Sequence, residues 1–266
     1  MLIRTVLAAI KVKIFKALYC RHAFYGNLRR LRSQVRRSWP GVDPLSDSRS
    51  EAVYVHFDRH GIIHDYVHEQ LRALVAAGFR ITFVSNAPKF SEGTAREVAS
   101  FCRQILWRRN VGYDFGAYKD GIKAIGNLDR VDRLVLMNDS VYGPFYPLKP
   151  LLEAVDPSKT DFWGITDSWE IAFHIQSYFL LFFPRALQSK QFREFWQRFP
   201  YVNRKNWVIE RGEVALSQLL VQHKFRAAAL APYWRAAERI LEKIDKVDST
   251  ELAPRTANSL SGSPIT

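Results

Sequence analysis

From residue 51 onward, short hydrophobic runs alternate with segments whose apolar residues recur every three or four positions. The runs AVYVHFD, RITFVSNA, QILWRRN and RLVLMNDS are short and rich in β-branched and aromatic residues, which is typical of strands. Helical spacing marks IIHDYVHEQLRALVAAG and SEGTAREVASFC, and Ser91 is a candidate N-cap of the second segment. This alternation predicts an α/β fold with a mostly parallel sheet and helices on both faces.

The predicted strands end on polar residues. Ligands of such sheets bind at the carboxyl ends of the strands, which here are Asp58, Asn86, Asn110 and the run Asn138, Asp139 and Ser140. Three short polar side chains directly after the apolar run LVLM would cost free energy if they were buried without partners. We therefore expect a ligand, a metal ion or a tight turn to satisfy them.

The segment RRNVGYDFGAYKDG places three glycines in a single predicted strand-to-helix turn. Gly112 and Gly116 would let the backbone approach a bulky polar ligand closely, and Asp114 with the nearby backbone N–H groups would supply hydrogen bonds. A purely structural turn is the alternative interpretation.

Positive charge is concentrated near the amino end. The 266 residues carry a net charge of +13, of which residues 1–50 contribute +9. In NLRRLRSQVRRSW, residues Leu28, Leu31, Val35 and Trp39 recur at helical spacing with arginines off that stripe. The pattern predicts a basic amphipathic helix, which either binds an anionic surface or packs on its own domain.

Composition and breaker residues suggest three parts. With 47% apolar residues the chain can bury a sizeable core. We expect a basic amphipathic arm and linker over residues 1–50, the α/β domain over residues 51–235, and a C-terminal helix with a polar, flexible tail over residues 236–266. The two cysteines are far apart and predict neither a disulfide framework nor a zinc site, which fits a cytoplasmic setting. No uncharged apolar run is long enough for a transmembrane helix.

Taken together, NVGYDFGAYKDG, LMNDSVYGPFYPL, DFWGITDS, HIQSYFLLF and GEVALSQLL resemble the rhamnan synthesis F family of bacterial surface-polysaccharide assembly, over roughly residues 52–234. The resemblance implies a GT-A-like (Rossmann-like) glycosyltransferase that transfers a hexosyl group, with rhamnose suggested, from a nucleoside-diphosphate donor to a growing lipid-linked polysaccharide or lipopolysaccharide. In that fold the strand carrying LVLM usually ends in an Asp-x-Asp metal motif. Here Asp139 is the one carboxylate left at that place to bind Mg²⁺ or Mn²⁺.

The same resemblance and the chemistry of sugar transfer assign roles to residues. The departing diphosphate must be neutralised by a cation or by basic side chains such as Lys119. Glu213 is the implied general base, with Glu210 as a competitor one helical turn earlier, and Asp139 is the second catalytic candidate. The expected donor-binding residues are Asp58, Asn86, Asn110, Gly112, Asp114, Gly116, Lys119, Asn138 and Ser140. Those expected to bind the acceptor or a sugar ring are Trp163, His174, Gln176 and Ser177.

Two classes of function remain open. In the first, the protein is a glycosyltransferase that lies peripherally at the inner face of the cytoplasmic membrane, bound to its anionic surface through residues 1–39. In the second, it is a non-catalytic or nucleic-acid-binding α/β protein with a basic arm. The sequence shows no helix-turn-helix or RNA-binding aromatic signature, and the charge lies outside the folded body, so no nucleic acid partner is expected.

Overall fold

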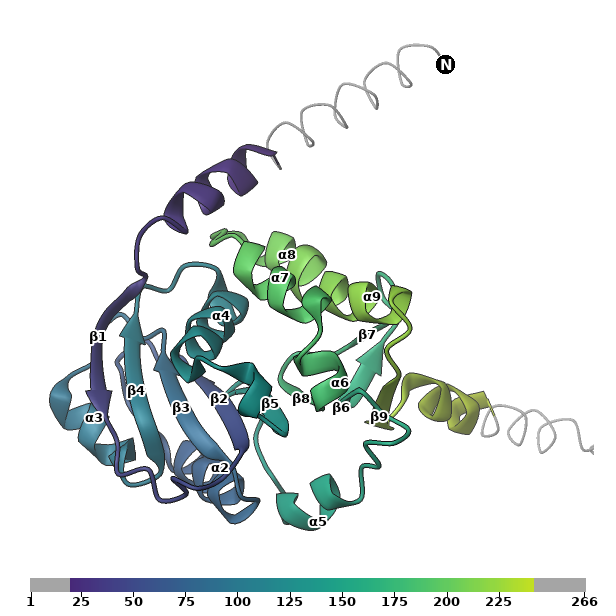
Figure 1. Ribbon diagram of the computed structural model, residues 1–266, viewed down its shortest axis with the longest axis horizontal. Coiled ribbons are helices and arrows are strands. Elements are labelled where there is room, and N and C mark those ends of the chain that lie inside the picture. The colour runs from purple at the N-terminus through teal and green to yellow at the C-terminus, as the bar shows by residue number, and fades with distance from the viewer. Residues whose placement is uncertain (1–19, 242–266) are drawn as a thin grey trace, which may run out of the picture.

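The computed structural model describes residues 20–241, and within them the chain forms a nine-stranded mixed sheet with helices on both faces (Figure 1). The strand order is β1-β4-β3-β2-β5-β8-β6-β7, and β9 pairs with β6. The strands are β1 (Val35–Pro40), β2 (Ser50–His56), β3 (Arg80–Ser85), β4 (Cys102–Arg108), β5 (Arg133–Asn138), β6 (Phe162–Ser168), β7 (His174–Ile175), β8 (Phe179–Phe182) and β9 (Ala227–Ala231).

Helices connect most of these strands. They are α2 (Asp65–Ala76), α3 (Glu92–Ala99), α4 (Tyr113–Ile125), the 3₁₀ turn η1 (Leu128–Arg130), α5 (Leu148–Glu153), α6 (Pro184–Leu187), α7 (Lys190–Arg198), α8 (Lys205–Val208), the π-helical segment η2 (Ile209–Val214) and α9 (Ala215–Gln222). Residues 20–29 form a further helix, called the arm helix below, and residues 233–241 form another at the opposite end of the described chain.

Strand direction puts most carboxyl ends at one edge of the sheet. Strands β4, β3, β2 and β5 are mutually parallel in that order. Strand β8 is antiparallel to both β5 and β6, so β6 runs in the same direction as β5. Strand β9 is parallel to β6 and shares that direction. The loops after β2, β3, β4, β5, β6 and β9 therefore meet at one edge, called the carboxyl edge below. The mostly parallel sheet predicted from the sequence is confirmed.

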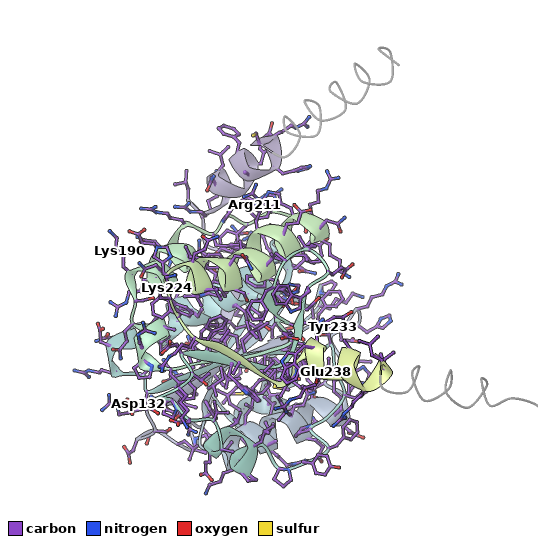
Figure 2. The ribbon with its side chains drawn as sticks, turned by 90° about the vertical axis from the view of Figure 1, so that its right-hand side faces the viewer. Asp132, Lys190, Arg211, Lys224, Tyr233 and Glu238 are labelled. Atoms are coloured by element: carbon purple, nitrogen blue, oxygen red, sulfur yellow. The ribbon has the colours of Figure 1, made fainter. Side chains whose placement is uncertain are left out.

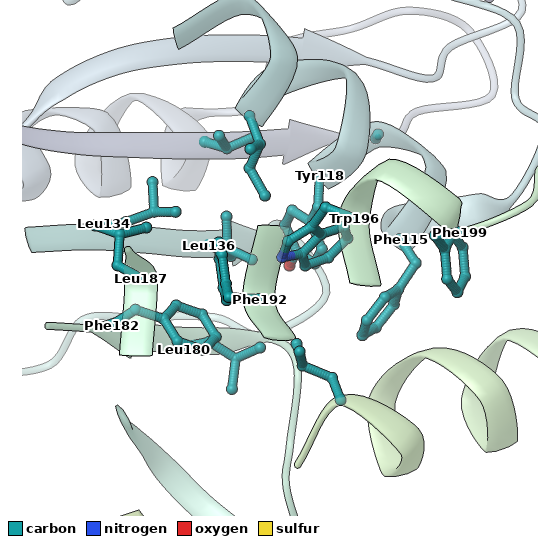
Figure 3. Close-up of a cluster of buried hydrophobic side chains, with 14 of the residues drawn as sticks. Phe115, Tyr118, Leu134, Leu136, Leu180, Phe182, Leu187, Phe192, Trp196 and Phe199 are labelled. Atoms are coloured by element: carbon teal, nitrogen blue, oxygen red, sulfur yellow. The ribbon is translucent and has the colours of Figure 1, made fainter. Parts of the chain in front are cut away.

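Each face of the sheet buries its own hydrophobic cluster, because successive strand residues point to opposite faces. Val53 and Val55 of β2 face α4 and α7 in one cluster, which Figure 3 shows around Phe115, Tyr118 and Trp196. The alternate residues of the same strand face α2 and α3 in the other cluster. Helices therefore cover both faces, as the alternating pattern predicts.

The amphipathic helix predicted over residues 27–39 is wrong beyond residue 29, where the arm helix ends. Residues Val35–Pro40 form β1, which pairs antiparallel with β4 and places Trp39 opposite Ile105. The register shifts between Val35 and Arg37, so Val35 packs against one hydrophobic cluster and Trp39 against the other. The otherwise unpaired edge of β4 favours a strand over a helix here. The sheet thus begins before residue 51. The arm residues 1–19 and the tail residues 242–266 lie outside the described residues.

The described part of the chain contains no helix whose length and apolarity would let it cross a membrane.

Candidate functional site

Asp139 is fixed at the junction between β5 and the end of β2. Its backbone N–H donates to the Val55 carbonyl at 3.1 Å, and its Oδ2 accepts from the Phe57 N–H at 2.8 Å. Burial raises the pKa of this carboxyl to about 7; the Phe57 hydrogen bond opposes the rise, while the charge of Asp114 adds to it. An acid in this environment titrates near neutral pH, as catalytic carboxyls often do.

Asp114 approaches the same place from the first turn of α4. Its Oδ2 accepts from Asn138 Nδ2 at 3.0 Å, and the Asn138 side-chain oxygen in turn accepts from the backbone N–H of Ser140 at 3.1 Å. Burial raises the pKa of Asp114; the Asn138 hydrogen bond opposes the rise, and the charge of Glu213 adds to it. Asn138 therefore links the two aspartates, because its side chain donates a hydrogen bond to Asp114 and Asp139 is the next residue in the chain.

Glu213 completes the group from the opposite side. It lies in the π-helical segment η2, a rare geometry that is frequent at functional sites. Its Oε1 accepts from the Ser177 N–H at 2.6 Å, and the Ser177 carbonyl accepts from the Tyr118 hydroxyl at 2.8 Å. Burial raises the pKa of Tyr118, and the charges of Asp114, Glu213 and Asp139 add to the rise. The charges of all three carboxyls thus act on one buried phenol. We call Asp114, Asp139 and Glu213 the acid cluster.

The acid cluster offers a partial ligand set for a divalent cation. Carboxylate oxygens are the ligands that Mg²⁺ and Mn²⁺ prefer. Residues 20–241 contain no group of three or more His, Cys, Asp or Glu side chains arranged to hold a metal ion. A cation bound at Asp139 would therefore need oxygen ligands from a bound phosphate group or water as well.

Other predicted donor residues have structural partners. Asn86 accepts from the buried Arg108 at 2.7 Å, and Arg108 forms an ion pair with Asp120 at 2.6 Å. Asp58 closes a tight turn by accepting from the N–H groups of His60 and Ile62; burial opposes these bonds, yet they lower its pKa to about 2. Its charge raises the pKa of the Asp139 carboxyl, so Asp58 borders the acid cluster.

The glycines of the predicted ligand loop serve close packing. Gly112 precedes α4 at a φ of 83°. A Cβ on Gly116 would come within 2.3 Å of the Val111 carbonyl oxygen. These contacts lie within the protein, as the structural interpretation of this turn expects, and Asn110 beside them is exposed.

Lys119 does not reach the acid cluster. Its Nζ donates to the carbonyls of Gln197 at 3.0 Å and Phe199 at 2.5 Å, at the end of α7. The charges of Arg108 and of Lys205, at the start of α8, help to hold down the pKa of Asp114. No local pattern singles out Lys205, because its proximity to Asp114 depends on how α8 packs against α4.

The residues predicted to bind a sugar ring separate into two groups. Trp163 is 4% exposed and packs edge-on against Phe179 in the core, and His174 is buried with its Nδ1 2.8 Å from the Ala172 carbonyl. Gln176 and Ser177 are partly exposed, and Ser177 holds Glu213. Only the second pair adjoins the acid cluster.

A further group of exposed aromatic side chains lies at the carboxyl edge. They follow the ends of four strands, and the signal was visible in the sequence as aromatic residues immediately after strand ends. Figure 2 shows one of them, Tyr233 after β9, whose N–H donates to Asp167 of β6. The exposed set is Phe57, Tyr142, Phe145, Tyr146, Trp169, Tyr233 and Trp234.

Two pockets lie elsewhere on the molecule. One of about 1110 Å³ lies between β1, α4 and α7, and one of about 580 Å³ lies beside α7 and α9. Neither is lined by the polar strand ends that were expected to form a cleft for a nucleotide-sugar, so that cleft stays a prediction.

Two relatives among known proteins match part of the chain. The chain is 30% identical over 190 residues to the uncharacterized protein y4gN of Sinorhizobium fredii, covering 70% of this chain and 48% of the relative. It is 31% identical over 141 residues to the virulence protein VirA of Vibrio anguillarum, covering 51% and 45%. The chain thus spans about half the length of the curated relatives it matches.

Solved structures share only a distant likeness. The mannosyltransferase Ktr4p from S. cerevisiae has a TM-score of 0.31 at 9% identity, covering 76% of this chain and 75% of that one. The bifunctional glycosyltransferase WbbM has a TM-score of 0.34 at 11% identity, covering 64% and 38%. Similarity this low supports no argument about the site.

The family assignment rests on a longer match. Residues 81–242, which include the whole acid cluster, match the family described as rhamnan synthesis protein F. Since the match spans more than half of the chain, this protein belongs to the rhamnan synthesis protein F family.

Proposed function

We propose that this protein is a GT-A-like glycosyltransferase that transfers a hexosyl group, with rhamnose as the suggested sugar, from a nucleoside-diphosphate donor to a growing lipid-linked surface polysaccharide. Family membership supports the polysaccharide context. The observation that carries the proposal is the acid cluster: three carboxyls from separate elements meet at the carboxyl edge, where two of them have raised pKa values. Such a group is costly to fold and is typical of a catalytic site.

In the proposed reaction Glu213 is the general base. The acceptor hydroxyl gives its proton to Glu213 while its oxygen bonds to the anomeric carbon of the donor sugar. The bond from that carbon to the diphosphate breaks, and the electron pair leaves with the diphosphate. The Ser177 N–H fixes one oxygen of the Glu213 carboxylate, which orients the other toward an acceptor.

Asp139 and Asp114 would act on the donor side. Negative charge develops on the departing diphosphate, so this side needs positive charge. Mg²⁺ or Mn²⁺ held by Asp139 and the donor phosphates would supply it, and Lys205 lies close enough to affect the pKa of Asp114. A bound cation would also relieve the repulsion that raises the pKa of Asp139.

The exposed aromatic side chains at the carboxyl edge suit a carbohydrate acceptor. Faces of Tyr and Trp rings provide rigid apolar area with little loss of conformational freedom. Trp169 is 61% exposed after β6, and Tyr142 is 73% exposed after β5, so two such rings follow neighbouring parts of the sheet. We expect the acceptor glycan to lie across this edge, close to Glu213.

The second class of function finds no support at the carboxyl edge. A nucleic-acid-binding protein needs positive charge where it contacts phosphates, and the carboxyl edge instead carries the acid cluster. We place the protein at the inner face of the cytoplasmic membrane as part of the same proposal, because a lipid-linked acceptor would be found there.

The test incubates the full chain with a panel of nucleotide-sugars and a lipid-linked acceptor and detects products by mass spectrometry. Glu213→Gln should lower transfer at least a hundredfold, whereas Glu210→Gln, one helical turn earlier, should retain it. A chelator should stop transfer if the cation assists. Activity of Glu213→Gln equal to that of the unaltered protein, with Glu210→Gln inactive, would transfer the role of base to Glu210.

A further inference from the structure

The ionisable residues that line the pocket of about 1110 Å³ are almost all basic. We call it the basic pocket; it lies between the turn after the arm helix, β1, α4 and α7. Asp120 is the one acid among its lining residues, and its carboxylate is already bound by Arg108 and the Tyr201 hydroxyl. The basic lining residues are Arg30, Arg32, Lys119, Lys123 and Arg193. No member of the acid cluster lines it.

Most of this positive charge has no carboxylate to balance it. Lys119 donates only to main-chain carbonyls. Burial and the charges of Arg30 and Lys123 lower its pKa to about 8, although the charge of Asp120 opposes the shift. Within residues 20–241, the side chains of Arg32 and Lys123 have no hydrogen-bond or ion-pair partner, and Arg32 is bonded only through its main chain, to Arg29 and Gln34. Arg193 is the exception, since it pairs with Asp129. The pocket therefore holds several mutually repelling cations that an anion would stabilise.

The pocket borders an exposed apolar surface. Phe24 and Leu28 of the arm helix are 60% and 46% exposed, and Leu31 in the following turn is 81% exposed. Asn27 and Leu31 line the pocket. Helical spacing places residues 24, 27 and 28 on one face, so the apolar stripe leads directly to the pocket. A ligand with a phosphate and an apolar tail matches both surfaces.

We propose that the basic pocket binds the phosphate headgroup of an anionic membrane lipid while the apolar stripe of the arm helix lies at the headgroup–acyl boundary. Guanidinium groups bind phosphate oxygens in bidentate fashion, and lysines add point charges. This role does not depend on the proposed sugar transfer.

The first experiment measures co-sedimentation of the full chain with vesicles of equal parts phosphatidylglycerol and phosphatidylcholine. The double variant Arg32→Gln, Lys123→Gln should lose about thirtyfold in vesicle affinity, since each basic residue at an anionic surface contributes about a factor of five. The matched control Lys89→Gln, Lys149→Gln removes the same charge from exposed residues outside the pocket and should change affinity less than twofold. Equal losses of vesicle affinity in both double variants would mean that net charge alone drives binding, and would overturn the proposed role of the pocket.

The second experiment separates a lipid from free phosphate and from other polyanions. Leu31→Asn removes apolar contact without altering charge, so it should weaken vesicle binding while leaving the binding of inorganic diphosphate, followed by calorimetry, unchanged. Diphosphate binding that is lost in Arg32→Gln, Lys123→Gln supports the pocket. Tight diphosphate binding by a protein that never sediments with vesicles would overturn the lipid as its source, as would preference for an RNA oligonucleotide over vesicles.

Discussion

Replacing Asp139 with Asn should make the protein more stable above neutral pH and abolish its proposed activity. Asn is isosteric with Asp, and its side-chain oxygen can still accept from the Phe57 N–H that now bonds Asp139. The change removes only the charge. In the folded protein that charge is disfavoured, because burial raises the pKa of the carboxyl to about 7 from 3.8.

The magnitude follows from the two pKa values. A carboxyl whose folded pKa is raised contributes stability that is present below its unfolded pKa and is lost as pH rises through the folded value. The loss for Asp139 is complete above about pH 7 and amounts to at most about 4 kcal/mol at 1.4 kcal/mol per pH unit. Solvent screening at a partly exposed group reduces this, so we expect Asp139→Asn to gain about 2 kcal/mol at pH 8.

Urea unfolding at pH 4 and pH 8 measures this gain. The two proteins should be equally stable near pH 4, and the variant should gain through pH 7. As a control, Asp156→Asn should have the opposite sign, because hydrogen bonds from Ser158 lower the pKa of the exposed Asp156 carboxyl. A gain in stability that is the same at both pH values, or no gain at pH 8, would refute the inference that the Asp139 charge destabilises the folded protein.

Three further changes probe the loop and the network beneath the acid cluster. Gly116→Ala should cost about 2 kcal/mol in urea unfolding, because its Cβ would come within 2.3 Å of the Val111 carbonyl oxygen. Gly93→Ala, in an exposed helix with room for a methyl group, should instead stabilise by about 0.5 kcal/mol. Arg108→Met should cost about 3–5 kcal/mol in urea unfolding, because it leaves the buried Asp120 carboxylate without its cation.

Local pattern was enough for the central strands and their helices. The runs ending at Asp58, Asn86, Asn110 and Asp139 became β2 to β5, and Ser91 caps α3 by accepting from the Thr94 N–H at 3.0 Å. These features depend on neighbours a few residues away, so periodicity and capping chemistry predict them. The apolar run FLLF likewise forms β8, which is buried throughout and lies inside the sheet between β5 and β6.

Strands at the margins depend on distant partners. Strand β1 forms because β4, about 70 residues later, offers an open edge. Strand β9 is AAALA, a composition that favours helix, yet it pairs with β6 in parallel register. Intrinsic propensity predicts secondary structure poorly where a free sheet edge can form hydrogen bonds with the backbone of the segment. No local pattern contains that information.

The part of the site that lies at strand ends could be predicted from the sequence. Asn138 and Asp139 follow β5, and the first turn of α4 brings Asp114 to them. Lys119 could have been excluded from the sequence, because five residues along a helix rotate a side chain by about 140° from Asp114. Glu213 needed the family resemblance, since a glutamate in an amphipathic segment looks like an ordinary exposed residue.

The placement of the acid cluster and the basic pocket on one helix has a consequence for the proposed reaction. Helix α4 presents Asp114 at its first turn to the acid cluster and Lys119 and Lys123 in its later turns to the basic pocket. A lipid held at the pocket would therefore position the carboxyl edge at a fixed height above the membrane. An enzyme with a lipid-linked acceptor needs that constraint, because the sugar end of its substrate lies close to the headgroups. If Arg32→Gln, Lys123→Gln slowed transfer to a lipid-linked acceptor but not to a soluble analogue, the two sites would act together through this helix.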